Sequence, residues 1–462
     1  MSIDTSGLPK RRPAADHEHV QHEGLMRELT AHIRFHGPLS VKDFMAAALT
    51  HPKFGYYVRE EVFGRAGDFT TSPEVSQTFG ELLGVWCVAT WQALGSPAAV
   101  RLTELGPGRG TLMADVLRSS AAFPSFHGAL SVHLVEVSPR LREAQARSLG
   151  CDGVGDGHGR TGCGVGVSWH GGLEEVPADA PLLLLGHEFL DALPTHQFVR
   201  TAKGWRERMV DLREQAGSRS SPVEEIPMPS GEGAGEGAGE GGGEEDAPRD
   251  LDGDERHLEF VLAPSPTPAS AVLTGKLFSG GGGGVEGSGG AQGGGPHQVE
   301  VCPAAQSVVQ QVAQRLTECR GAALFIDYGA DETPADTLRG ISRHQYVHPL
   351  HRPGEVDLSV DVDFGALRRA ALEAAPELRI PPLVEQRHFL GAMGIETRVN
   401  ALLRRASSVD QQREILASAQ RLIDSPGMGS AYKALAMLHA DIADAPGFPP
   451  ADATDDTSRR EQ

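Results

Sequence analysis

Three closely spaced glycines follow an acidic residue in the chemically most informative segment of the chain. Gly106, Gly108 and Gly110 come after an apolar run that contains Glu104, and a helix-like run starts at Thr111. Glycine lets a backbone approach a ligand closely because it has no Cβ, and N–H groups at the start of a helix attract polar ligands. The segment therefore predicts a strand, a nucleotide-binding loop and a helix. The dinucleotide fingerprint does not fit, because Thr111 stands where it requires glycine.

The loop has the form Glu-x-Gly-x-Gly-x-Gly, which resembles the first motif of S-adenosylmethionine (SAM) methyltransferases. In that arrangement the loop holds the amino-acid and ribose portions of SAM. Glu104 is then expected to lie near the cationic amino-acid portion. An ordinary strand–helix turn is the alternative, and the glycines alone do not decide between the two.

A second acidic residue, Glu136, ends the next apolar run, thirty residues after Gly106. In doubly wound folds an acid at this place accepts hydrogen bonds from ribose hydroxyls. The alternative is a surface glutamate just before a helix that Ser138 caps. The order and spacing after the glycine loop favour the ribose role.

Two further acids, Glu188 and Asp191, follow the apolar run 181–185. Ligands gather outside the carboxyl ends of parallel strands, and two carboxylates three residues apart are able to converge on one cation. A guanidinium group suits such a pair, because it is planar, always charged and bound by carboxylates in a bidentate way. Locally, a helix cap at Asp191 and a solvent-facing Glu188 explain the pattern equally well.

Two other places in the sequence carry residues that could belong to a site. Asp327 also ends an apolar strand, and it either lines the same cleft or forms a turn after a core strand, which we favour slightly. His344, His348 and His351 have a spacing that suggests a metal site. Prolines interrupt that segment and no cysteine assists it, so a metal is not expected.

The elements that must position these residues form a repeating pattern. Strand-like runs at 100–105, 131–137, 165–169, 181–185 and 322–327 alternate with helical runs. Such alternation predicts an α/β fold with a parallel sheet covered by helices. Further strands are expected at 195–199, 206–212 and 258–262, and helices over much of 365–374 and 401–438.

Two segments rich in glycine and proline interrupt the pattern, and we expect both to be disordered surface insertions. The first holds twelve acids against two arginines between 224 and 256, which accounts for half of the net charge of −20. The predicted division of the chain is then as follows. It comprises a flexible start (1–22), a helical extension with a cofactor-covering loop (23–97), a Rossmann-like SAM-binding core (98–212), an acidic insertion (213–256), a core strand (257–263), a second insertion (264–298), the rest of the core with a helical substrate side (299–440) and a flexible end (441–462).

Composition excludes several classes of protein. The net negative charge makes nucleic acid an improbable partner, because proteins that bind nucleic acid carry basic patches. No apolar run approaches 18 residues, so no membrane span is expected. Five cysteines without a Cys-x-x-Cys pair indicate neither a disulfide framework nor a cysteine zinc site. The N-terminus is a poor secretory signal and an imperfect organellar transit peptide.

Eight short motifs then occur in an order that resembles one family. They are Gly55-Tyr56-Tyr57, Gly67-Asp68-Phe69-x-Thr71-Ser72-Pro73-Glu74, the glycine loop, Glu188-Phe189-x-Asp191-Ala192-Leu193-Pro194, Ile326-Asp327-Tyr328-Gly329, Asp336-Thr337-Leu338-Arg339-Gly340, Pro353-Gly354 and Asp361-Val362-Asp363-Phe364. The chain resembles the mitochondrial MidA-type arginine methyltransferases that assist assembly of respiratory complex I. The likeness covers roughly 23–212 and 299–440.

The resemblance implies a SAM-dependent protein arginine N-methyltransferase that forms symmetric dimethylarginine on a core subunit of complex I in the mitochondrial matrix. It also implies that the three glycines and Glu136 hold SAM, that Glu188 and Asp191 serve the arginine, and that Thr71 and Ser72 close over the cofactor. It implies no oligomeric state. Two positions depart from the family, since its members usually carry Asn at 187 and many carry Asp at 348, where this chain has His187 and His348.

Three other functions stay open at this level. The chain could be a SAM-binding assembly chaperone with vestigial catalysis or a methyltransferase for a small molecule, because no motif reads out the substrate directly. A dinucleotide oxidoreductase is disfavoured by Thr111.

Overall fold

The computed structural model describes residues 15–58, 72–152, 154–213, 257–279, 297–332, 335–343 and 345–449. The acidic insertion (213–256, apart from its first residue), Thr71 and His344 lie outside the described residues.

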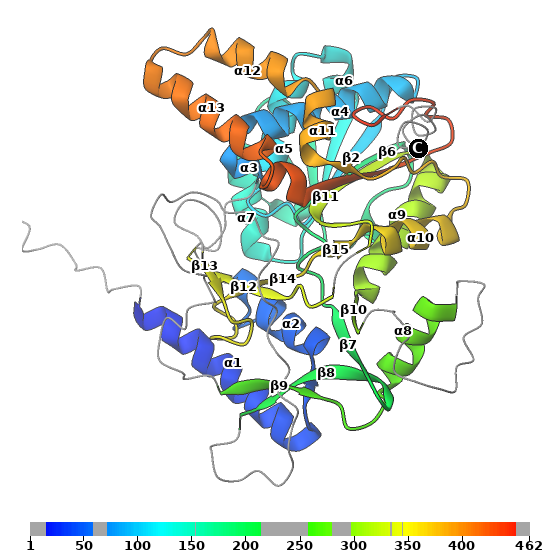
Figure 1. Cartoon of the computed structure of the whole chain (residues 1–462). Helices are drawn as coiled ribbons and strands as arrows, with labels where there is room; N and C mark the ends of the chain where they lie inside the picture. Colours follow the sequence, from blue (N-terminus) through cyan, green and yellow to red (C-terminus); the bar gives the residue numbers. More distant parts are fainter. Residues whose placement is uncertain are drawn as a thin grey trace, which may run out of the picture.

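A nine-stranded sheet forms the centre of the larger half of the molecule (Figure 1). Its strand order is β16-β17-β11-β6-β2-β3-β5-β4, with β15 beside β11. The strands β11, β6, β2, β3 and β5 run parallel, and β4, β16 and β17 add antiparallel edges. The strand bounds are β2 (Val100–Leu105), β3 (Leu130–Val135), β4 (His158–Arg160), β5 (Gly166–His170), β6 (Leu182–His187), β11 (Gly321–Ala330), β15 (Val362–Asp363), β16 (Val384–Glu385) and β17 (Tyr432–Leu438).

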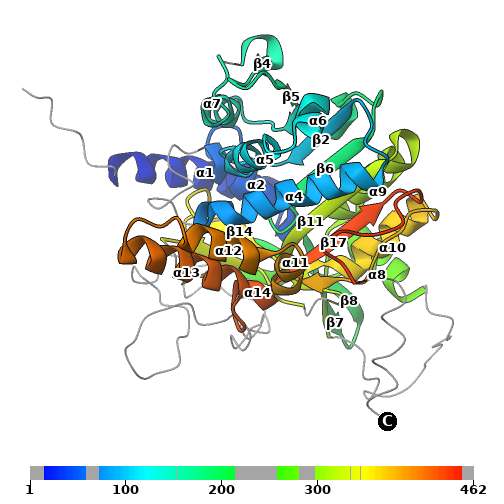
Figure 2. The same ribbon diagram turned by 90° about the horizontal axis from the view of Figure 1, so that it is seen from above.

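Helices cover both faces of this sheet (Figure 2). Side chains of α4, α5, α6 and α11 build the core on one face, and those of α9 and α10 build it on the other. Every residue of β6 is buried, because a parallel strand covered on both faces meets no water. The helix bounds are α3 (Ser72–Val75), α4 (Gln77–Ala93), α5 (Thr111–Ser120), α6 (Pro124–Ala129), α7 (Pro139–Ser148), α9 (Pro303–Cys319), α10 (Phe364–Ala374), α11 (Gln386–Ala392), α12 (Ile395–Leu403), α13 (Val409–Ile423) and α14 (Met428–Ala431).

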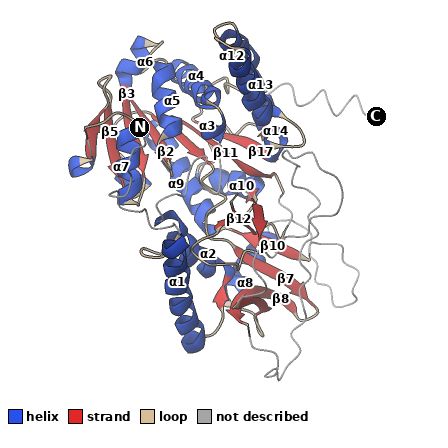
Figure 3. Ribbon diagram, turned by 90° about the vertical axis from the view of Figure 1, so that its left-hand side faces the viewer, coloured by secondary structure: helices blue, strands red, loops and turns tan. Residues whose placement is uncertain are grey.

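A smaller lobe packs at the carboxyl ends of the central strands (Figure 3). It has its own apolar core, to which two helices and two small sheets contribute. The helices are α1 (Ala15–His36) and α2 (Val41–Thr50). The sheets contain β1 (Leu39–Ser40), β7 (His196–Thr201), β8 (Gly204–Leu212), β9 (Leu258–Leu262) and β10 (Gln298–Val301), and β12 (Arg339–Ser342), β13 (Gln345–Val347) and β14 (Asp357–Ser359).

The predicted α/β class and the Rossmann-like core are confirmed. Strand β2 begins and ends at the predicted residues, and α5 begins at Thr111 as predicted. The predicted division differs from the structure in the small sheet. Strands β7, β8 and β9, which we assigned to the core, pair with β1 and β10 instead. Alternation of apolar and polar residues predicts a strand but does not say which sheet it joins.

Four further expectations need correction, and three of them concern the ends and insertions. Helix α1 begins at residue 15, within the segment expected to be flexible. The second insertion (264–298) starts with helix α8 (Pro268–Ser279), because its glycines are concentrated further on, in residues 280–295, which the structure does not describe. Residues 441–449 contribute Ile442 and Phe448 to the main core.

The last of these corrections concerns residues 432–438, where a helix was expected and β17 is found. Their Ala, Leu and Met side chains favour helix in isolation. Pairing along the whole of β11 buries this segment in the sheet, and that tertiary environment outweighs the local preference.

Candidate active site

The glycine loop adopts a conformation that only glycine accepts without strain. Gly106, Gly108 and Gly110 all have positive φ, at 59°, 52° and 80°. A Cβ on Gly106 would lie 2.7 Å from the ring of Phe189, and one on Gly110 would lie 3.2 Å from the Cα of Gln145. Gly110 also serves as the N-cap of α5. Residues 106–110 therefore form a concave stretch of backbone before α5, here called the cradle, and a side chain added to it would occupy the space for a ligand.

Glu104 lies just before this cradle and is 3% exposed. Its Oε2 has no hydrogen-bond partner among the residues that the structure describes. Burial raises the pKa of Glu104 to about 8. A buried carboxyl oxygen without a partner is costly unless a ligand satisfies it, so the position suits a ligand with a cationic or N–H group.

Glu136 follows β3 and is also buried. Its side chain accepts hydrogen bonds from the backbone N–H of Ser138 (2.8 Å) and from Nε2 of Gln145 (3.2 Å). Burial raises the pKa of Glu136, although these bonds oppose the shift. Its position at the end of the strand beside β2 is the one predicted for an acid that holds a ribose.

Gln145 is a residue of this site that sequence reasoning missed. From α7 its amide nitrogen donates to the carbonyl of Gly108 (2.9 Å) as well as to Glu136, and its carbonyl accepts from Nε1 of Trp169 (2.9 Å). One buried side chain thus joins the glycine loop, the predicted ribose acid and β5. A lone glutamine in a charged helical run carries no motif that could have revealed this role.

The acidic turn after β6 is held by Asp327 from the neighbouring strand β11. Oδ2 of Asp327 accepts from the backbone N–H groups of Phe189 (3.1 Å), Leu190 (2.8 Å) and Asp191 (3.3 Å). Asp327 lies within β11, which continues to Ala330, so the prediction that it forms a turn after a core strand is wrong; its carboxylate instead holds the acidic turn after β6.

Glu188 is the most constrained residue of that turn. It has a positive φ of 48°, which a residue with a Cβ adopts at a cost. Oε1 of its side chain accepts from the N–H of Ser72 (3.1 Å), the hydroxyl of Ser72 (3.3 Å) and the hydroxyl of Tyr432 (2.9 Å). Its Oε2 is buried and has no partner within the described chain. Burial raises the pKa of Glu188 to about 8.

Asp191 lies in a different environment. Its burial raises its pKa to about 6, and the positive charge of Arg339 opposes that shift. Arg339 comes from β12 in the smaller lobe, where it forms an ion pair with Asp361 and donates from Nε to Ser359 (3.1 Å). The carbonyl of Asp191 accepts from the N–H of Val360 (3.0 Å), so the smaller lobe fixes this end of the turn.

His187, one of the two departures from the family, faces the same site. Its Nε2 lies 3.4 Å from Oε1 of Glu188. Burial lowers the pKa of His187 to about 3, so the ring is neutral near pH 7 and this approach is not an ion pair. The ring packs against Phe79 and lies parallel to the ring of Tyr432.

The structure brings most of the predicted residues together. The glycine loop and Glu136 follow the adjacent strands β2 and β3, and Glu104 lies within β2. Phe189 of the acidic turn contacts the loop at Gly106. Ser72 lies against Glu188, whereas its predicted partner Thr71 is outside the described residues. Among the described residues, no group of three or more His, Cys, Asp or Glu is placed to hold a metal.

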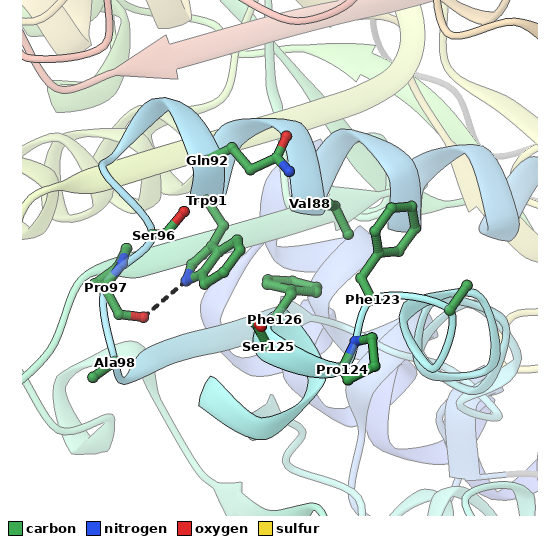
Figure 4. A pocket seen from close by; sticks show the side chains of 11 residues that line it. Val88, Trp91, Gln92, Ser96, Pro97, Ala98, Phe123, Pro124, Ser125 and Phe126 are labelled. Carbon is green, nitrogen blue, oxygen red and sulfur yellow. Dashed lines mark hydrogen bonds between the residues drawn. The ribbon is translucent and has the colours of Figure 1, made fainter.

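A surface pocket lies elsewhere, between α4 and α6 (Figure 4). Its volume is about 600 Å³, and the side chains of Trp91, Phe123 and Phe126 line it together with Pro97. No acid or base lines it, so it offers no group for the chemistry considered above.

The fold and the cradle define a Rossmann-like SAM methyltransferase. A family described as "Putative S-adenosyl-L-methionine-dependent methyltransferase" matches residues 82–380, and the chain belongs to it. The chain is 38% identical to the mouse (Mus musculus) protein named protein arginine methyltransferase NDUFAF7, mitochondrial, over 90% of this chain and 84% of that protein. It is 36% identical to the human (Homo sapiens) protein of the same name, over 90% and 83% of the two chains.

A solved structure shares the fold of this chain. A structure from Burkholderia thailandensis, bound to S-adenosyl-homocysteine (SAH), superposes with a TM-score of 0.69 at 24% identity, over 95% of this chain and 97% of that chain. The cofactor of this family is SAM, as predicted, and the cradle and the unpartnered Oε2 of Glu104 fit it. The names of the relatives confirm the predicted mitochondrial localisation. No helix in the described part of the chain has the length and apolar character of a membrane span.

Proposed function

We propose that this chain is a protein arginine N-methyltransferase that forms symmetric dimethylarginine on a core subunit of respiratory complex I, in the mitochondrial matrix. One observation carries the proposal. A buried carboxyl oxygen, Oε2 of Glu188, has no partner among the described residues and lies at the end of a strand adjacent to the strand that leads into the cofactor cradle. The names of the mouse and human relatives support arginine as the acceptor.

Each group of residues has its own part in the reaction. Gly106, Gly108, Gly110, Glu104 and Glu136 hold the cofactor, and Ser72 closes over it. SAM, when bound, supplies an electrophilic methyl group. Glu188 and Asp191 supply the negative charge that binds and orients a guanidinium group.

Glu188 is also the proton acceptor. A guanidinium nitrogen that gains a methyl group must lose a proton, and Oε2 is the carboxyl oxygen able to receive it. The raised pKa of Glu188, about 8, makes it a stronger base than an exposed glutamate. Burial excludes water from this oxygen and strengthens its attraction to a cation.

Transfer of a labelled methyl group tests this proposal. Purified wild-type protein, Glu188→Gln and Gly108→Val are incubated with methyl-labelled SAM and a purified complex I subcomplex. We expect Glu188→Gln to slow transfer roughly 100-fold or more, because the proton acceptor is lost. Gly108→Val is expected to abolish SAM binding, because its φ of 52° excludes a β-branched residue.

The control for charge removal is Glu143→Gln, an exposed residue of α7 whose side chain is 64% exposed. Analysis of the hydrolysed product separates symmetric from asymmetric dimethylarginine. Equal labelling by wild type and Glu188→Gln would contradict the proposed site. If complex I assembly survives in Glu188→Gln cells that lack the methyl mark, the assembly-chaperone function gains support instead.

A further inference from the structure

The carboxylate of Glu136 is held through both of its oxygens. Oε1 accepts from the backbone N–H of Ser138 at 2.8 Å, and Oε2 accepts from Nε2 of Gln145 at 3.2 Å. Donors on both oxygens fix the plane of a carboxylate as well as its position. A pair of oxygens in a fixed plane suits two neighbouring hydroxyl groups, and the 2′ and 3′ hydroxyls of a ribose are such a pair.

The amide of Gln145 can lie in only one orientation. Nε1 of Trp169 on β5 lies 2.9 Å from its Oε1, and an indole N–H donates a hydrogen bond but cannot accept one. The amide oxygen must therefore face Trp169. The amide nitrogen then faces the other way, where it donates to Glu136 and to the carbonyl of Gly108 at 2.9 Å.

Helix α7 holds Gln145 closely against the glycine loop. The side chain is 0% exposed, and a Cβ on Gly110 would lie 3.2 Å from its Cα. Ser138 caps the same helix, since its hydroxyl accepts from the N–H of Leu141 at 3.4 Å. Both donors to Glu136 therefore come from α7 and its cap.

The same three hydrogen bonds of Gln145 could also serve only to hold α7, β5 and the glycine loop together. A purely structural role predicts that loss of the amide weakens every ligand of the site by one factor. Orientation of Glu136 predicts instead that the loss falls on ligands that carry both ribose hydroxyls. The two roles are therefore separated by a ratio of affinities and not by an affinity.

We propose that Gln145 is a positioning residue for the ribose of the cofactor. Its amide nitrogen orients the carboxylate of Glu136 toward the two ribose hydroxyls. The same nitrogen turns the carbonyl of Gly108 toward α7, so that the acid and the loop keep one geometry relative to each other. This inference rests on the part of the proposed function that assigns the ribose to Glu136, and it does not depend on the acceptor of the methyl group.

Calorimetry with SAH and its 2′-deoxy and 3′-deoxy analogues tests the inference on the full chain. We expect the wild type to bind SAH about ten-fold or more tightly than either analogue, because loss of one hydroxyl leaves a buried carboxylate oxygen without its partner. Gln145→Met keeps the length of the side chain but removes the amide. It should reduce each of these preferences to less than about three-fold, because the carboxylate is no longer held in one plane.

Trp169→Phe tests the same point without a change in Gln145. It keeps an aromatic ring but removes the N–H that fixes the amide, so each preference should fall to a value between those of the wild type and Gln145→Met. The control for loss of an amide is Gln311→Met, at an exposed position of α9, which should keep the wild-type preferences. Urea denaturation identifies any variant that does not fold, and Trp169→Phe alone then decides.

A double-mutant cycle with Glu136→Ala tests whether Gln145 acts through Glu136. Glu136→Ala removes both carboxylate oxygens, and we expect it to bind SAH and the two analogues with similar affinities. Addition of Gln145→Met to this variant should leave the ratios of affinity unchanged. A further fall in the ratios would show that Gln145 acts on the hydroxyls without Glu136, and it would overturn the positioning role.

The outcomes also separate this inference from the proposed function. Equal weakening of SAH and both analogues in Gln145→Met, or unchanged preferences in both Gln145→Met and Trp169→Phe, would overturn the inference alone. A wild type that binds the three ligands equally would overturn the assignment of the ribose to Glu136, and the inference with it. Absence of methyl transfer to the complex I subcomplex, with the preferences as expected, would overturn only the proposed acceptor.

Discussion

At the scale of single residues, the site contains two buried carboxyl groups, each with one oxygen that accepts no hydrogen bond from the described residues. Oε2 of Glu104 and Oε2 of Glu188 both lack partners within the described chain, and the pKa of each group is raised to about 8. Such groups reduce stability and persist where a ligand completes them. Binding of the cofactor and the acceptor is therefore expected to raise the free energy of unfolding by more than burial of their surfaces alone would, because each would pair with one of these carboxyl oxygens.

The pH dependence of stability tests directly how much the buried carboxyl group of Glu104 destabilises the fold. Its pKa is raised on folding, so the folded state keeps a proton that the unfolded state releases between pH 4.5 and about 8. The contribution of Glu104 to stability is therefore present below pH 4.5 and is lost as pH rises to about 8, by about 1.4 kcal/mol per pH unit. We expect Glu104→Gln to remove this loss, so urea denaturation without SAM should show its advantage over the wild type growing from pH 5 to pH 8. A constant difference across this range, or the same trend in Glu143→Gln, would contradict the prediction.

At the scale of elements, the acidic turn depends on the strand beside it. Asp327 in β11 accepts hydrogen bonds from three consecutive backbone N–H groups of the turn that follows β6. Parallel pairing of β6 with β11 places the end of β6 beside Ile326, directly before Asp327, so the sheet and not the local sequence holds the turn. The positive φ of Glu188 is maintained in the same way.

Replacement of Asp327 should show how much its hydrogen bonds to the turn contribute to the free energy of unfolding. Asp327→Ala leaves buried N–H groups without an acceptor, and we expect it to lower the free energy of unfolding by about 3 kcal/mol or more. Asp327→Asn keeps one acceptor oxygen and should lose less. Chemical denaturation at pH 7 measures both changes. Similar losses in the two variants would show that the packing of the side chain, and not its hydrogen bonds, holds the turn.

At the scale of the whole molecule, the reaction site is shared between two lobes. The main sheet supplies the glycine loop and both acids, and the smaller lobe supplies the hydrogen bond of Val360 to the carbonyl of Asp191. Buried Arg208 on β8 ties the small sheet to the segment before β12 through its ion pair with Asp336. Its guanidinium also lies 4.0 Å from the centroid of the Phe260 ring on β9.

Loss of the Arg208–Asp336 ion pair should make local unfolding of the smaller lobe more frequent and leave the main sheet unchanged. Arg208→Met leaves Asp336 without its cation, and breaking a buried pair from one side costs about 3 to 5 kcal/mol. We expect faster amide hydrogen exchange in residues 336–341 and in β8, with β2 and β3 unchanged. Uniform exchange across both lobes would instead indicate that they unfold as one unit.

The sequence by itself determined the chemistry at the strand ends. The glycine spacing, the acids at 104, 136, 188 and 191, and the alternation of strands and helices are local patterns, because they depend on backbone sterics and on burial of neighbouring side chains. These patterns located the glycine loop and the acids at the strand ends, and the ordered motifs predicted the family to which the chain belongs.

Only the tertiary structure decided how these residues are used. The sheet to which β7, β8 and β9 belong, the strand β17 in place of a helix, the links made by Gln145 and the hydrogen bond of Val360 to Asp191 all join segments far apart in the chain. Such contacts are set by which surfaces pack together, and no local pattern encodes them. The sequence therefore located two acids, and the fold left one of them, Glu188, with a buried carboxyl oxygen that has no partner in the described structure.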